Sequence, residues 1–359
     1  MTAEVLNQTE TVSLEDAIHL IVANPSVRYM LRGEPGIGKT SIALAIARMS
    51  GLPLAMDRPI DVANLDLGDV CMPVIDHKDK VTRYYPNAKF AIHTGKPVVM
   101  CLDEFTKGAD AVKNMLHPAL EIFMPRLGDL PIPEGSIVYM TGNLDSDGVG
   151  DGLAQHTRQR IVELIIRKPT AEEWLRWAAN NGIAAVLMAW VHRYGFCLAS
   201  YLDGVINEFN FNPAEPNSNV VSPRTLEIAS RQILTRENVS PNALRAALTG
   251  TVGAPAAVSI MSFIDFQDKL PSLQDILEKP ATAEIPEDEG ARAVLTFNLL
   301  EHVEKDTLTN IMEYLRRDEM DEEWRVIFGV CLARHETKKH IAFSNAAFPK
   351  WARDNEDLL

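Results

Sequence analysis

A phosphate-binding pattern, G-x-x-x-x-G-K-[ST], is matched by the eight residues from Gly33 to Thr40. Glycines in such a loop let successive backbone N–H groups turn inward around phosphate oxygens, and the following helix offers its positive N-terminus. Lys39 would reach the β- and γ-phosphates, and the Thr40 hydroxyl would coordinate Mg²⁺. The pattern also occurs by chance in unrelated loops, but here it lies between a predicted strand and a predicted helix. We therefore predict that ATP and Mg²⁺ are bound by Gly33, Glu34, Pro35, Gly36, Ile37, Gly38, Lys39, Thr40 and Ser41.

Two acidic residues, Asp103 and Glu104, follow the apolar segment 98–102. In a parallel sheet the end of such a strand lies beside the phosphate loop, at the carboxyl edge. We predict that Asp103 holds Mg²⁺ through its water shell and that Glu104 polarises the attacking water. An isolated Asp-Glu pair after a strand is usually a solvated turn, but its place downstream of a phosphate loop favours catalysis.

Asn143 comes at the end of a third apolar segment, 136–141. The commonest role of such an Asn is to cap the next turn. On a strand next to the two acids it could instead hydrogen-bond the γ-phosphate or the attacking water, and we favour this catalytic role.

Three arginines are candidates for contact with the phosphates. Arg158 and Arg160 lie between a helix and the last predicted strand. They either compensate a helix C-terminus or provide an arginine finger that reaches the γ-phosphate of a neighbouring subunit. The sequence leaves open which of the two is the finger. Arg224 follows Ser222-Pro223 in the first turn of a helix, where a cation opposes the helix dipole by ~0.3–1 kcal/mol, so we expect an anionic target.

The elements that position these residues are strands with helical segments between them. Apolar segments at 27–31, 97–102, 136–141 and 161–166 predict an α/β domain with a parallel sheet and flanking helices. Beyond residue 168 the pattern becomes helical, with a capping box at Thr170–Glu173. The predicted domains are a flexible leader (1–12), an α/β nucleotide-binding domain (13–168), a helical lid (169–270) and a C-terminal helical extension (271–359).

Composition limits the class of protein. The 359 residues are 46% hydrophobic and 23% charged, which is typical of a soluble globular protein. No apolar run approaches the ~20 residues of a membrane span, and the N-terminus lacks a signal-peptide pattern, so we expect a cytoplasmic location. The net charge of -14 disfavours nonspecific binding to nucleic acid. The four scattered cysteines predict neither a disulfide framework nor a structural metal site.

Together the motifs resemble the AAA+ ATPase superfamily, specifically its MoxR-type branch with the dynein-related and magnesium-chelatase relatives. Residues 33–40 resemble Walker A, 102–104 Walker B, Asn143 sensor 1, and 222–224 sensor 2. The branch is indicated further by Asp66–Asp69, by Leu102–Lys107, and by a helix and hairpin expected over Leu120–Pro133. The resemblance covers about residues 13–235.

This resemblance implies a hexameric ring with ATP sites between subunits. The ring would act on another protein, often one with a von Willebrand factor A domain. The family's finger usually stands in Asp-Arg-Phe, whereas this chain has Gln159-Arg160-Ile161. Arg160 therefore aligns without its acidic neighbour, and Arg158 remains the alternative.

We expect a chaperone-like ATPase that remodels a protein partner. A nucleic-acid motor or loader would need a basic pore or an added DNA-binding module, and the sequence indicates neither. A GTP-dependent restriction subunit would carry Asn-x-x-Asp, but Ser146 lies three residues after Asn143. A scaffold that binds nucleotide without hydrolysing it is disfavoured by the intact pair of acids.

Overall fold

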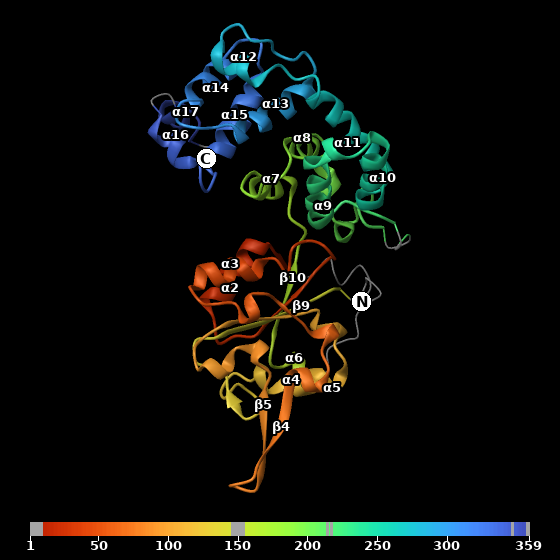
Figure 1. The fold of residues 1–359 in the computed structure, drawn as a ribbon, viewed down its shortest axis with the longest axis vertical. Coiled ribbons are helices and arrows are strands. Elements are labelled where there is room, and N and C mark those ends of the chain that lie inside the picture. The colour runs from red at the N-terminus through yellow and green to blue at the C-terminus, as the bar shows by residue number, and fades with distance from the viewer. Residues whose placement is uncertain (1–9, 145–154, 213–214, 216–217, 346–347, 357–359) are drawn as a thin grey trace. The chain divides into compact units, whose positions relative to one another are not determined.

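The computed structural model describes residues 10–144, 155–212, 215, 218–345 and 348–356 (Figure 1). The chain divides into two compact units between Lys168 and Pro169. Residues 1–9, most of the predicted leader, lie outside the described part. Within that part, no helix is long and apolar enough to cross a membrane.

The first unit is built on a parallel sheet in the order β1-β10-β2-β9-β6-β3. The strands are β1 (Thr11–Val12), β2 (Tyr29–Arg32), β3 (Ile60–Asp61), β6 (Val99–Asp103), β9 (Ile137–Gly142) and β10 (Val162–Ile166). Every residue of β2 and β9 is buried, as expected for the centre of a parallel sheet covered on both faces. The predicted parallel α/β sheet is therefore confirmed. Its two-residue edge strands were not predicted, and β1 uses residues that the sequence assigned to the leader.

Helices cover both faces of this sheet because alternate residues of each strand point to opposite sides. On one face Leu31 and Cys101 pack with α2 (Leu14–Ala23) and α3 (Ile42–Ser50). On the other face Met30 and Met100 pack with α4 (Leu67–Val70) and α5 (Asp110–Leu116). The phosphate loop connects β2 to α3. Both elements belong to the core on the α2–α3 face, so this core anchors the two ends of the loop.

Two hairpins extend this unit. The longer hairpin pairs β4 (Cys71–Asp76) with β5 (Val81–Pro86) and projects from the body of the unit (Figure 1). The shorter one pairs β7 (Arg126–Leu127) with β8 (Leu130–Pro131), within the region where the family resemblance led us to expect a hairpin. The backbone groups of Asp129 and Tyr84 join the two hairpins through a 2.8 Å hydrogen bond. At Gly128, where φ is 55°, an added Cβ would lie 2.3 Å from the Tyr84 carbonyl oxygen. This junction therefore needs glycine.

The second unit is helical throughout its described part. Its α-helices are α7 (Ala171–Ala179), α8 (Ala185–Arg193), α9 (Pro223–Leu234), α10 (Pro241–Val252), α11 (Ala254–Gln267), α12 (Leu273–Glu278), α13 (Glu289–Glu301), α14 (Leu308–Leu315), α15 (Glu322–Ala333), α16 (Lys339–Ser344) and α17 (Phe348–Asp354). One hydrophobic core runs from Trp174 to Ala352, so residues on both sides of the Pro-rich stretch 271–286 share it. In α8 every residue from Ala185 to Val191 is buried, which makes it the central helix.

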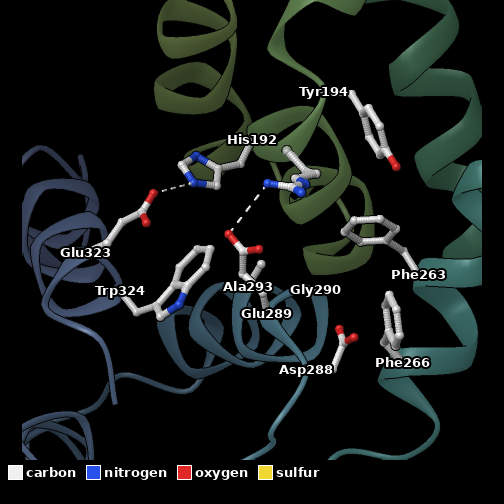
Figure 2. Close-up of a pocket in the computed structure, with 11 residues that line it drawn as sticks. His192, Tyr194, Phe263, Phe266, Asp288, Glu289, Gly290, Ala293, Glu323 and Trp324 are labelled. Carbon is white, nitrogen blue, oxygen red and sulfur yellow. Dashed lines mark hydrogen bonds and ion pairs between the residues drawn. The ribbon is translucent and has the colours of Figure 1, made fainter. Parts of the chain in front are cut away.

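A cavity of about 360 Å³ opens between helices of the second unit (Figure 2). Around it, His192 Nε2 lies 3.3 Å from Glu323 Oε1, within hydrogen-bond distance, and Arg193 forms an ion pair with Glu289 at 3.5 Å. The basic residues lie in the last turn of α8, and the acids lie in the first turns of α13 and α15. These are the ends at which such charges offset the helix dipoles. The charges around the cavity therefore have a structural explanation within the helices.

His335 stabilises the turn that precedes a late helix of the same unit. Its Nδ1 accepts hydrogen bonds from the backbone N–H groups of Thr337 and Lys338, each at 3.3 Å, just before α16. The side chain is buried, and burial lowers the pKa of the imidazole below its usual value of 6.5. Protonation would place a hydrogen on Nδ1 and remove its acceptor role. The folded state therefore favours neutral His335.

This arrangement predicts a dependence of stability on pH. Because the unfolded state binds the His335 proton more tightly, His335 should contribute stability above pH 6.5 that is lost as pH falls below it. All five tryptophans lie in the second unit, so tryptophan fluorescence during urea unfolding reports on this unit. We expect His335→Gln to reduce the drop in unfolding midpoint between pH 7.5 and 5.5. The matched variant at the exposed His340 should keep that drop, and an unchanged drop in His335→Gln would contradict the assignment.

Candidate nucleotide site

The phosphate loop has the backbone geometry that its glycines predict. Gly36 has a φ of 75° and Gly38 a φ of 108°, a region that residues with a Cβ rarely adopt. At Gly33 an added Cβ would lie 2.6 Å from the carbonyl oxygen of Ile166 on β10. The loop therefore turns tightly against the sheet, and each of these glycines has a steric reason.

Lys39 lies inside the loop and is only 8% exposed. Its Nζ donates hydrogen bonds to the carbonyl oxygens of Gly33 and Glu34, both at 2.7 Å. The same ammonium donates to Asn143 Oδ1 at 3.2 Å. The loop lysine and the Asn at the end of β9 are thus brought together, although 104 residues separate them in the sequence.

Asp103, the last residue of β6, faces the end of the phosphate loop. The Thr40 hydroxyl donates to Asp103 Oδ1 at 2.9 Å. A second hydroxyl, that of Thr141 on the adjacent β9, donates to the same oxygen. Thr141 Oγ1 also accepts the backbone N–H of Glu104 at 3.2 Å. One threonine therefore orients both acids, and the only sequence signal for it was a polar residue ending a buried apolar strand.

Glu104 has an unusual backbone conformation. Its φ is 51°, in the left-handed region, which for a residue with a Cβ costs of order 1–3 kcal/mol. Its Oε2 lies 2.9 Å from Lys107 Nζ, an ion pair that does not align as a hydrogen bond. Strain of this kind is concentrated at active sites. The conformation aims the Glu104 side chain away from the course that a regular strand would give it.

Asn143 is held mainly through its backbone. Its carbonyl oxygen accepts two hydrogen bonds from the Arg32 guanidinium, at 3.1 Å each, and Arg32 also pairs with Glu163 at 2.8 Å. The side chain is 7% exposed and turns to Lys39. Residues 145–154 lie outside the described part, so the alternative role as a cap of the next turn stays untested.

These residues fit a magnesium nucleotide. The hydroxyl of Thr40 and the carboxylate of Asp103 are oxygen donors 2.9 Å apart, and oxygen donors are the ligands that Mg²⁺ prefers. The loop places a buried ammonium and the N-terminal end of α3 beside them. Thr40 and Asp103 could therefore hold the metal, while Lys39 and the loop N–H groups hold phosphate.

The two finger candidates have different surroundings in the structure. Arg158 ends the short helix α6 (Gln155–Arg158) and is exposed, and its side chain makes no hydrogen bond or ion pair with the other described residues. Arg160, two residues on, has its Nε 2.8 Å from Glu121 Oε1. This contact joins two residues that are 39 positions apart in the chain.

Arg224 lies in the second unit, in the first turn of α9. The helix starts as predicted, since Ser222 accepts the N–H of Thr225 at 3.2 Å and Pro223 occupies the first position. Its contact with nucleotide stays a prediction.

The glycine-rich loop between β2 and α3, with paired acids at the end of β6, defines a P-loop nucleotide-binding domain. Residues 29–146 match the family described as "ATPase family associated with various cellular activities (AAA)", and this match indicates an enzyme that hydrolyses ATP. A solved structure of a mutant RuvB from Thermotoga maritima is similar at 17% identity and a TM-score of 0.36, covering 86% of this chain and 92% of that chain. No curated protein matches the chain.

Proposed function

We propose that this protein is a Mg²⁺-dependent AAA+ ATPase of MoxR type that assembles as a ring with ATP sites shared between subunits and remodels a protein partner. The observation that carries the proposal is the meeting of Lys39, Asp103 and Asn143 at one edge of the sheet, beside the strained Glu104. Its ring size of six and its chaperone-like action rest on the resemblance of the motifs to the MoxR branch.

Each residue of this site would have a distinct task. Lys39 binds and orients the phosphates, and Thr40 and Asp103 hold Mg²⁺, which supplies positive charge to the phosphates when bound. Glu104 orients a water molecule and accepts its proton, and Asn143 keeps that water or the γ-phosphate in position. Arg224 would transmit the state of the nucleotide to the helical unit.

A protein is the partner that the charge of the chain favours. The net charge of -14 disfavours the phosphate neutralisation on which most nonspecific nucleic-acid binding depends. We propose a protein client, of which a von Willebrand factor A domain protein is the candidate that the resemblance suggests. A variant that binds ATP without hydrolysing it would retain such a client during purification.

The shared site can be tested by mixing inactive variants. Arg160→Ala subunits keep an intact phosphate loop, and Lys39→Ala subunits keep an intact finger. If Arg160 acts on the neighbouring subunit, random mixing should restore about a quarter of the parent ATPase rate. One interface in four then combines an intact phosphate loop from one subunit with an intact Arg160 from the next. Phosphate release measures the rate, and gel filtration with ATP establishes that each variant assembles.

The matched control mixes Lys39→Ala with Glu104→Gln. Both changes lie on the phosphate-loop side of the site, so this mixture should stay inactive. If the Arg160→Ala mixture also stays inactive although both variants form rings, action across the subunit interface is refuted. A protein that remains monomeric with ATP would refute the ring itself.

A further inference from the structure

We infer that Glu121 is a positioning residue for Arg160, holding its guanidinium ready for the nucleotide of the neighbouring subunit. This inference rests on the proposed finger role of Arg160. Its observation is the 2.8 Å contact between Glu121 Oε1 and Arg160 Nε. It supplies from a distant part of the chain the acid that Gln159 fails to provide.

The backbone beneath Glu121 is rigid. Ala119 and Leu120, the two residues before it, are fully buried, and they end a short 3₁₀ helix, His117–Leu120. The Nε of Arg28, itself 2% exposed, donates to the carbonyl oxygen of Ala119 at 3.2 Å. The Glu121 carboxylate is therefore carried by a fixed support.

The same arginine anchors the chain that follows Arg160. The carbonyl oxygen of Arg28 accepts the N–H of Val162, the first residue of β10, at 2.8 Å. The N–H of Arg160 donates to the carbonyl oxygen of Thr157 at 3.0 Å. Arg28 thus connects the supports of both partners, which fixes the distance between Glu121 and the base of the Arg160 side chain.

The chemistry of the contact suits positioning. A guanidinium has five N–H donors in a planar fork, and the contact with Glu121 uses the donor at Nε. Because the guanidinium is planar and rigid, a contact at Nε sets the orientation of the whole group. The side chains are 32% and 41% exposed, so the pair contributes little to stability, and its main effect is on orientation.

The test is Glu121→Gln, which keeps the shape of the side chain and removes its charge. We expect the ATPase kcat to fall about tenfold, which corresponds to a modest loss of transition-state stabilisation, while the KM for ATP stays unchanged. The double variant with Arg160→Ala should be no slower than Arg160→Ala alone, because Glu121 is proposed to act only through Arg160. The exposed Glu134→Gln removes the same charge from the same unit and should keep the parent rate.

Mixing separates positioning from a merely structural role. When Glu121→Gln subunits are mixed with Lys39→Ala subunits, turnover per intact phosphate loop should rise, because half of the neighbours then supply a well-held finger. Mixing with Arg160→Ala should give no such rise. A Glu121→Gln defect that no mixture relieves, or that adds fully to Arg160→Ala, would overturn the inference.

The two proposals fail in different ways. If Arg160→Ala loses turnover and Glu121→Gln does not, the finger stands and only the positioning role is lost. If Arg160→Ala itself keeps the parent rate, the finger assignment fails and the positioning role fails with it.

Discussion

Replacing Glu104 with Gln is expected to leave ATP bound while lowering turnover by about 10²–10⁴-fold, the usual contribution of a general base. Gln keeps the length of the side chain but cannot accept the proton of the attacking water. The backbone of Glu104 is held independently of the side-chain charge, since its N–H donates to Thr141 Oγ1 at 3.2 Å. The loss should therefore be chemical rather than conformational.

Equilibrium binding of ATP measures affinity, and the rate of phosphate release measures turnover. Asp110→Asn removes a carboxylate whose side chain is 91% exposed in the same unit and should alter neither quantity. Normal turnover by the Glu104→Gln protein would show that another group activates the water. Loss of binding would show instead that Glu104 supports the nucleotide.

Replacing Lys39 with Ala should abolish detectable ATP binding at concentrations that saturate the parent protein. Hydrogen bonds to charged groups contribute roughly 1.5–3 kcal/mol each, so losing two phosphate contacts would weaken affinity by about 10²-fold or more. The ammonium also ties the loop carbonyls of Gly33 and Glu34 to Asn143. The loop should therefore lose these three hydrogen bonds as well as the positive charge.

Titration with a fluorescent ATP analogue would measure this effect. Lys96→Ala removes an exposed lysine from the same unit and serves as the control for charge. Asn143→Ala removes the third partner of the ammonium and should lower turnover more than affinity. If Lys39→Ala binds the analogue as tightly as Lys96→Ala does, the loop is not the phosphate site.

The sequence predicted β2, β6 and β9 because each lies in a mostly apolar segment, the pattern of a parallel sheet buried on both faces. The edge strands β1 and β3 are two residues long and carry too few residues for any period to be recognised. The β4–β5 hairpin was missed for another reason. Most of its side chains are exposed, so burial imposes no alternating pattern on it.

The residues of the candidate site likewise fall into those that the sequence predicted and those that it did not. Two short local motifs contain Lys39, Thr40, Asp103 and Glu104. Such motifs can be recognised in a single sequence because their residues are neighbours in the chain. Thr141 and Glu121 act through partners 38 and 39 residues away. Those contacts depend on strand order and on the anchoring of short segments, which no local pattern encodes.

The left-handed backbone of Glu104 sets stability against activity at one position. Glycine adopts a φ of 51° without steric cost, so it would relieve the strain that Glu104 carries. A directed-evolution library screened for thermostability alone would thus enrich glycine at position 104. The selected proteins would be more thermostable but would no longer hydrolyse ATP. Retention of glutamate there requires selection for turnover.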